Sequence, residues 1–266
     1  PMKKIVIIGS GFSSLSAACY LAKKGHQVQV LEKNDSLGGR ARQFTKDGFT
    51  FDMGPSWYWM PDVFESFFGD FGKQVSDYYT LDRLSPGYQV VFGKDDVFPV
   101  EDSIAKIAAR FEEIEDGSGA KLTRFLEKAR NNYDIAVKDL VYRPGVSPLE
   151  LVTPQTVKKV GLFFTNIRSQ VEKQFKNQKL RSLLQFPVLF LGAKPESTPA
   201  FYNFMNYADF GLGTWHPKGG MYQIVDGMVS LGKSLGVRYH TDHGVDEILL
   251  RNGKASGVRT GEKIIE

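Results

Sequence analysis

The chain has 266 residues, of which 42% are hydrophobic and 24% are charged, and its formal net charge is +4. This composition is that of a globular protein with one large or two modest domains, and it excludes collagen-like, coiled-coil and disordered chains. A single Cys excludes an internal disulfide, and the small positive charge gives no reason to expect a nucleic-acid partner. No stretch offers the roughly 18 uncharged apolar residues that a membrane-spanning helix needs.

The first part of the chain has the pattern of strand, glycine turn, helix, strand and acid. Residues 3–8 are rich in Ile and Val and predict a buried β-strand, which the turn Gly9-Ser10-Gly11-Phe12-Ser13-Ser14 follows. Residues 15–24 have helical spacing, and Gly25 is placed to end that helix. A second strand over 27–31 ends on Glu32. The pattern predicts a βαβ unit that binds a dinucleotide; the alternative is a βαβ unit without a ligand.

Each part of this pattern has a physical reason. Gly9 allows the tight turn, and Gly11 lets a pyrophosphate approach the backbone at the positive end of the helix. Glu32, 23 residues after Gly9, is placed to accept hydrogen bonds from a ribose diol, and its charge disfavours NADP. Ser14 replaces the third glycine of the pattern, which sets how closely helix and strand pack. The predicted cofactor-binding residues of this part are Gly9, Gly11, Phe12, Ser13, Ser14, Glu32 and Lys33.

A second glycine loop follows the acid and favours FAD over NAD. Gly38 and Gly39 permit close backbone approach, and Arg40 can donate charge-assisted hydrogen bonds to phosphate. An NAD-binding domain would normally continue into another helix here. Residues 42–44 and 49–52 flank a turn at 46–48 and predict a β-hairpin, which Met53-Gly54-Pro55-Ser56 closes.

These motifs resemble the FAD-dependent carotenoid desaturases of the bacterial phytoene desaturase type, within the flavin amine oxidase and phytoene dehydrogenase superfamily. The resemblance covers nearly the whole chain. It rests on the Gly9–Ser14 turn, residues 32–41, Asp52-x-Gly54-Pro55-Ser56, Phe190-Leu191-Gly192, Thr198-Pro199-Ala200 and Trp215-His216-Pro217-Lys218-Gly219-Gly220-Met221. Such enzymes are about twice as long as this chain, so the resemblance implies an N-terminal half.

The resemblance implies an α/β fold in which a Rossmann-like βαβ FAD-binding domain carries an inserted α+β domain. The FAD-binding domain is discontinuous, over 1–70 and 219–266, and the inserted substrate-binding domain with membrane-facing helices spans 71–218. A strand beginning near Val245 is expected to pass the adenine. The resemblance thus adds Gly54, Pro55, Ser56 and Val245 to the predicted FAD contacts.

Other elements follow from periodicity and turn residues. Hairpins are predicted over 88–100 and 245–259, and helices over 103–115, 119–141 and 219–236. Aromatic residues gather in two stretches, nine of them within 57–79 and eight within 186–215. They predict either an aromatic core or a long apolar tunnel for an extended polyene, and the resemblance favours the tunnel for some of them.

Residues 157–181 carry the basic excess of the chain. Seven basic residues accompany one acid, Glu172, and apolar residues from Val157 to Phe175 recur at helical spacing. Such a basic amphipathic helix can lie in a membrane interface; the alternative is a surface helix that covers the core. We expect a cytoplasmic protein that associates peripherally with the membrane through this segment.

The resemblance implies an oxidoreductase that introduces double bonds into a carotenoid, with the flavin accepting hydride from the polyene and a quinone or oxygen accepting the electrons. No catalytic side chain is predicted, because the flavin carries the chemistry. His240 and His243 fall at a strand end, so no metal site is expected. The alternatives are a carotenoid isomerase or saturase, a flavin amine oxidase, and a non-enzymatic carotenoid-binding protein.

Overall fold

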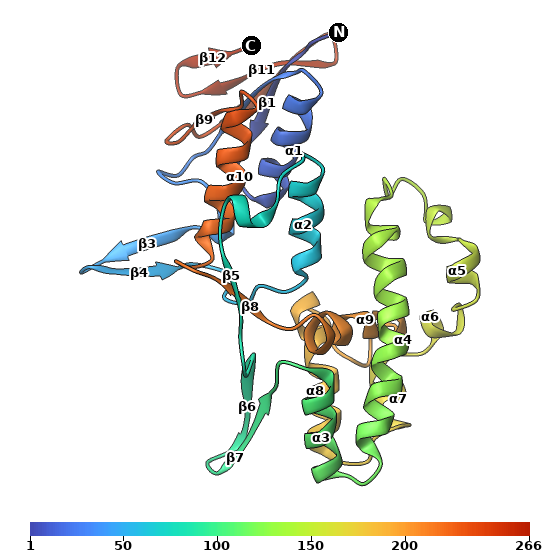
Figure 1. Ribbon diagram of the computed structural model, residues 1–266. Coiled ribbons are helices and arrows are strands. Elements are labelled where there is room, and N and C mark those ends of the chain that lie inside the picture. Colours follow the sequence, from blue (N-terminus) through green and yellow to red (C-terminus); the bar gives the residue numbers. More distant parts are fainter. The chain divides into compact units, whose positions relative to one another are not determined.

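The computed structural model describes residues 1–266, apart from the side chains of Pro148 and Leu151. The chain divides into two compact units, whose elements are labelled in Figure 1. The first unit comprises Pro1–Tyr58, Asp62–Asp82 and His216–Glu266. The second comprises Trp59–Pro61 and Arg83–Trp215. The chain passes between them within β5 (Leu81–Arg83) and β8 (Trp215–Pro217).

The first unit is built on a parallel sheet of β1 (Lys4–Ile8), β2 (Gln27–Leu31) and β9 (Arg238–His240), with β2 in the middle. Helix α1 (Phe12–Lys23) packs on this sheet through Ala18, which joins Val28 and Val30 in a buried cluster. Helix α10 (Tyr222–Ser234) lies beside α1 (Figure 1). Because β1 and β2 are parallel, their carboxyl ends share one edge, and the segments that follow them meet there.

The first unit also contains a hairpin, a helix and a second sheet. The predicted hairpin is present as the antiparallel strands β3 (Gln43–Lys46) and β4 (Phe49–Asp52), and helix α2 spans Pro61–Gly69. A separate antiparallel sheet contains β10 (Glu247–Arg251), β11 (Lys254–Thr260) and β12 (Lys263–Ile265). The strand expected to begin near Val245 begins two residues later, at Glu247, so Val245 lies in the loop before it.

The second unit is mainly helical with one hairpin. Its elements are β6 (Tyr88–Gly93), β7 (Asp96–Val100), α3 (Ile104–Ile114), α4 (Ser118–Lys138), α5 (Pro154–Val157), α6 (Gly161–Phe164), α7 (Ile167–Glu172), α8 (Gln178–Gln185) and α9 (Phe204–Asn206). Ser103 caps α3 by accepting a hydrogen bond from the backbone N of Lys106, as its position before the helix predicts. The core forms where α3, α4, α7 and α8 bury Ile107, Phe111, Leu122, Val171 and Leu183.

The prediction of one amphipathic helix over 157–181 was wrong. The segment is divided among α5, α6, α7 and α8, because Asn166 and Asn177 each cap a new helix by accepting a backbone hydrogen bond. The apolar residues of the expected face also separate. Ile167, Val171 and Phe175 are fully buried in the core, whereas Val157, Val160 and Phe164 are 57%, 52% and 87% exposed. The later part of the segment therefore covers the core, and the earlier part presents apolar side chains to the surroundings.

Many aromatic residues of the two rich stretches are core residues. In the first unit Tyr58 and Phe68 are buried, and Tyr58 shares a hydroxyl contact of 3.0 Å with Tyr79. In the second unit Phe210 is buried against Phe111. Phe190 differs: it is 54% exposed and its ring centre lies 4.9 Å from that of Trp59. In the part of the chain that the structure describes, no helix is long and apolar enough to cross a bilayer.

Candidate functional site

A pocket of about 700 Å³ opens in the first unit at the carboxyl ends of β1 and β2. A second pocket of about 540 Å³ shares Gly11, Arg40 and Gly54 with it. Twelve of the fourteen predicted cofactor residues line one or both pockets: Gly9, Gly11, Phe12, Ser13, Glu32, Lys33, Gly38, Gly39, Arg40, Gly54, Pro55 and Val245. Residues that the sequence predicts separately, from four segments, are thus brought together at one place.

The two glycine loops are in direct backbone contact. Gly39 has a φ of 59°, a left-handed conformation that favours glycine, and a Cβ atom there would lie 3.0 Å from the Cα of Gly11. The backbone N of Gly38 also donates to the carbonyl oxygen of Ser10, at 3.1 Å. Absent side chains therefore let the second loop close over the first.

Glu32 is the buried acid of the pocket, only 3% exposed. Its Oε2 atom accepts hydrogen bonds from the backbone N of Ser10 at 3.0 Å and from the Ser10 hydroxyl at 2.5 Å. Its Oε1 atom accepts from the backbone N of Asn34 at 3.0 Å and from the Asn34 side-chain amide. Burial raises the pKa of Glu32, but these four hydrogen bonds outweigh burial and hold the pKa below its ordinary value. The carboxyl group is therefore charged at neutral pH.

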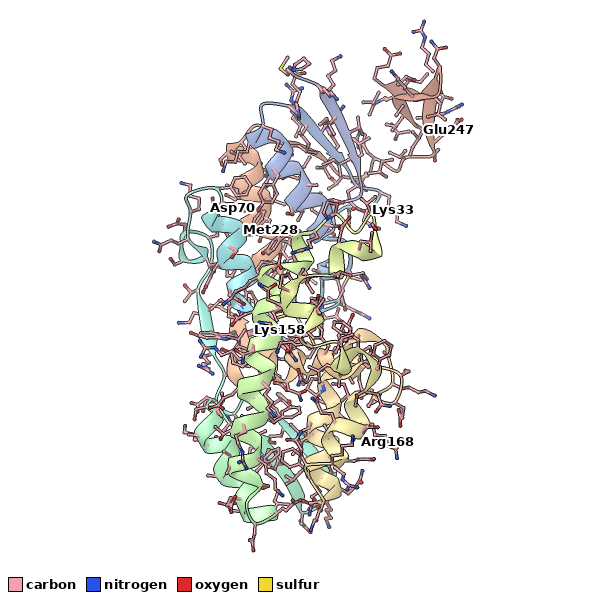
Figure 2. The ribbon with its side chains drawn as sticks, turned by 90° about the vertical axis from the view of Figure 1, so that its right-hand side faces the viewer. Lys33, Asp70, Lys158, Arg168, Met228 and Glu247 are labelled. Atoms are coloured by element: carbon pink, nitrogen blue, oxygen red, sulfur yellow. The ribbon has the colours of Figure 1, made fainter. Side chains whose placement is uncertain are left out.

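Three basic residues also line the first pocket. Lys33, labelled in Figure 2, and Arg40 are exposed at the pocket, and Arg42 lines it while its Nε donates to the carbonyl oxygen of Gly39 at 3.0 Å. Helix α1 begins after Gly11, which has no side chain to cap the first turn, and Gly11, Phe12 and Ser13 at this helix start line the second pocket. A diphosphate would meet cationic side chains and a positive helix end here.

Two predicted residues are absent from the described residues that line these pockets. Ser14 is half-buried within α1, and Ser56 is exposed beyond Pro55. Their role as cofactor contacts stays a prediction. The structure adds residues that sequence reasoning missed: Ile8, Ser10, Leu31, Asn34, Ala41, Arg42, Met53 and Gly244. Two of these residues are short and polar: Ser10 lies between two glycines, and Asn34 lies two residues after the acid. These positions could have indicated them as parts of the site.

The donor set fits a dinucleotide with an adenosine end. Glu32 provides acceptors for ribose hydroxyls, Arg40 and the start of α1 provide donors for the diphosphate, and Ile8, Leu31 and Val245 give the first pocket apolar walls for a flat base. Among the described residues, no group of three or more His, Cys, Asp or Glu side chains is placed to hold a metal ion.

The chain belongs to the flavin containing amine oxidoreductase family, whose model matches residues 12–264. It is 44% identical over 250 residues to the carotenoid 3,4-desaturase of Haloarcula japonica, covering 93% of this chain and 50% of that protein. It is 33% identical over 267 residues to the zeta-carotene-forming phytoene desaturase of Myxococcus xanthus, covering 99% of this chain and 52% of that protein. The chain spans about half the length of the curated relatives it matches. The predicted resemblance to carotenoid desaturases is therefore confirmed.

Solved structures agree with the fold. The crystal structure of an oxidoreductase from Methanosarcina mazei matches with a TM-score of 0.60 at 22% identity, covering 100% of this chain and 57% of that one. The predicted α/β class with a Rossmann-like FAD-binding fold is confirmed. Membership in a flavin-containing family confirms FAD as the cofactor at the level of the family.

Proposed function

We propose that the whole protein to which this chain belongs is an FAD-dependent desaturase that introduces double bonds into a carotenoid. One observation carries the proposal: two glycine loops in backbone contact enclose a pocket around a buried, charged Glu32. The names of the relatives support the substrate class, because the two reported above are desaturases of carotenoid-type polyenes.

The residues of the first unit hold the cofactor in this proposal. Glu32 accepts hydrogen bonds from the ribose, while Arg40 and the N-terminal turn of α1 neutralise the diphosphate. Gly244 and Val245 border the adenine from the loop before β10. When bound, FAD supplies a hydride acceptor for a saturated carbon pair of the polyene. No side chain of this chain is assigned a catalytic role.

We further propose that the second unit contacts a membrane through an exposed apolar surface, since a carotenoid dissolves in the bilayer. The apolar surface consists of Val141, Tyr142, Val146, Leu149, Val152, Val157, Val160 and Phe164, each at least 52% exposed. So many exposed apolar side chains within the single segment 141–164 are unusual for a surface that faces only water. Lys158, labelled in Figure 2, is exposed within the same segment and suits anionic headgroups. The contact is thus proposed over 141–164, and only residues 157–164 overlap the segment expected from sequence.

Product analysis tests the proposed activity. The full-length protein, loaded with FAD, is incubated with phytoene in lipid vesicles, with oxygen or a soluble quinone as the electron acceptor. A product with a longer conjugated chain supports a desaturase, and the acceptor that sustains turnover identifies the oxidant. A product of unchanged oxidation state indicates an isomerase. In parallel assays, a shorter chromophore formed when a reductant replaces the electron acceptor indicates a saturase, and oxidation of an added amine without polyene conversion indicates an amine oxidase. A protein that binds polyene but no flavin is a carotenoid-binding protein.

A further inference from the structure

Ser10 connects three segments that meet at the cofactor pocket. It lies between Gly9 and Gly11 and is 1% exposed. Its hydroxyl donates to Oε2 of Glu32 at 2.5 Å and accepts from the backbone N of Gly38 at 3.1 Å, a donor that it shares with the Ser10 carbonyl oxygen. A chain of hydrogen bonds therefore runs from the second glycine loop, through the side chain of Ser10, to the carboxylate after β2.

Hydrogen bonds within the protein already use the acceptor positions of the Glu32 carboxylate. A carboxylate offers about four acceptor positions, and Ser10 and Asn34 each occupy two of them. The two backbone donors belong to the main chain just after β1 and β2, whereas the Ser10 hydroxyl and the Asn34 amide can rotate. A ribose hydroxyl must therefore share the carboxylate with these donors, and the orientation of the carboxylate that it meets is set by Ser10.

We propose that Ser10 is a positioning residue for the ribose of the bound dinucleotide and that it acts through Glu32 without touching the ligand. The inference rests on the proposed function for the identity of the ligand. The N–H and the hydroxyl of Ser10 both donate hydrogen bonds to Oε2 of Glu32. The Ser10 hydroxyl in turn accepts a hydrogen bond from the backbone N of Gly38. Neighbouring hydrogen bonds of this kind strengthen one another, so removing the hydroxyl loosens the carboxylate at the point where the ribose binds.

The test uses ADP and 2′,3′-dideoxy-ADP, which differ only in the ribose hydroxyls. Dissociation constants are measured by calorimetry on the flavin-free, full-length protein. For Ser10→Ala we expect ADP to bind about tenfold more weakly, the loss typical of a hydrogen bond to a charged group. We expect the affinity for 2′,3′-dideoxy-ADP to change less than about threefold, because that ligand makes no hydroxyl contact with Glu32. Ser10→Cys, which keeps a weak donor of similar size, is expected to fall between Ser10→Ala and the unmodified protein.

A double-mutant cycle separates action through Glu32 from direct contact. In a Glu32→Gln background, Ser10→Ala is expected to change the affinity for ADP less than about twofold, since the carboxylate that it orients is gone. Ser36→Ala is the matched control, because its hydroxyl contacts Asp35 and lies outside both pockets. We expect that control to bind both nucleotides as the unmodified protein does.

Three results would overturn the inference. Ser10→Ala could weaken both nucleotides equally, which indicates general damage to the loop. It could leave ADP binding unchanged. Ser10→Ala could also lower the affinity for ADP as much in the Glu32→Gln background as in the unmodified protein, which indicates direct contact between Ser10 and the ligand. In each case the unmodified protein still binds ADP and the proposed function stands. An unmodified protein that binds neither ADP nor FAD overturns the proposed function and this inference together.

Discussion

A Cβ atom on Gly54 would lie 2.0 Å from the carbonyl oxygen of Arg40, closer than any non-bonded contact allows. The segment that leaves β4 therefore passes directly against the second glycine loop, and Gly54 and Arg40 both line the two pockets. Asp52, just before this segment, accepts a hydrogen bond from the backbone N of Met221 at the start of α10. The hairpin end is thus anchored to a helix from the other end of the chain.

Replacing Gly54 by Ala is expected to displace one of the two loops, because neither the Cβ atom nor the Arg40 backbone can yield by rotation. We expect a loss of roughly 1–3 kcal/mol in the free energy of unfolding, typical of overpacking, and a clear loss of flavin affinity. Urea unfolding and FAD titration measure the two effects. Gly69→Ala is the control, since its Cβ would meet no atom within 4 Å. Equal behaviour of the two variants would contradict the close contact.

The stability that Glu32 provides should depend on pH in the acid range. Its folded-state pKa is lowered by hydrogen bonds from Ser10 and Asn34, against the opposing effect of burial, so its stabilising contribution is complete above the unfolded pKa of about 4.3. It is lost as pH falls through the lower folded-state pKa. We therefore expect the difference in unfolding free energy between the unmodified protein and Glu32→Gln to narrow between pH 6 and pH 3. A difference that stays constant over this range would show that the charge is not stabilised.

Asp209 should have the opposite dependence. It is 1% exposed, its Oδ2 accepts a hydrogen bond from Tyr88 at 2.6 Å, and Oδ1 has no hydrogen-bond partner among the described residues. Burial raises its pKa to about 8, so the folded state becomes less stable as pH rises from about 4 towards 8.

Asp209→Asn keeps an acceptor for Tyr88 and removes this charge. We expect its free energy of unfolding, relative to that of the unmodified protein, to rise by about 3 kcal/mol between pH 5 and pH 8. Urea unfolding at the two pH values measures the change. Asp95→Asn, in the exposed turn between β6 and β7, is the control and should show no such gain. A variant less stable than the unmodified protein at pH 8 would mean that the surroundings of Asp209 stabilise its charged carboxylate.

The apolar surface predicts vesicle binding. Phe164→Ser combined with Val146→Ser removes its two most exposed side chains, which are 87% and 84% exposed. We expect the fraction that sediments with phosphatidylcholine and phosphatidylglycerol vesicles to fall severalfold, because burial of apolar side chains drives such binding. Val91→Ser, at an exposed position of β6, is the matched control. Equal sedimentation of all three proteins would assign the surface to another partner.

The cofactor unit was largely predictable from sequence, because its signals are local. A strand, a glycine turn and an acid at a fixed distance determine where Gly9 and Glu32 meet once the strands are parallel. The position of Gly54 against Arg40 was not predictable from spacing, since it depends on how the hairpin returns. The hydrogen bonds of the Ser10 side chain were not predicted for a similar reason, because its partners Glu32 and Gly38 are 22 and 28 residues away in the sequence.

The segment 157–181 shows where periodicity misleads. Its apolar residues recur at helical spacing, but Asn166 and Asn177 accept backbone hydrogen bonds and restart the helix twice. Local capping therefore decided the structure over the longer pattern. The aromatic stretches were ambiguous because a ring in the core and a ring at an apolar surface have the same sequence signature. Phe68 is fully buried and Phe190 is half exposed.

Electron transfer from a polyene to bound FAD is the step that defines the proposed function of this protein. The most direct measurement is anaerobic mixing of the FAD-loaded, full-length protein with phytoene in vesicles, followed by visible absorption. We expect the flavin absorption to bleach while a more conjugated polyene appears in equal amount. A flavin that stays oxidised while bound phytoene remains unchanged would contradict the account.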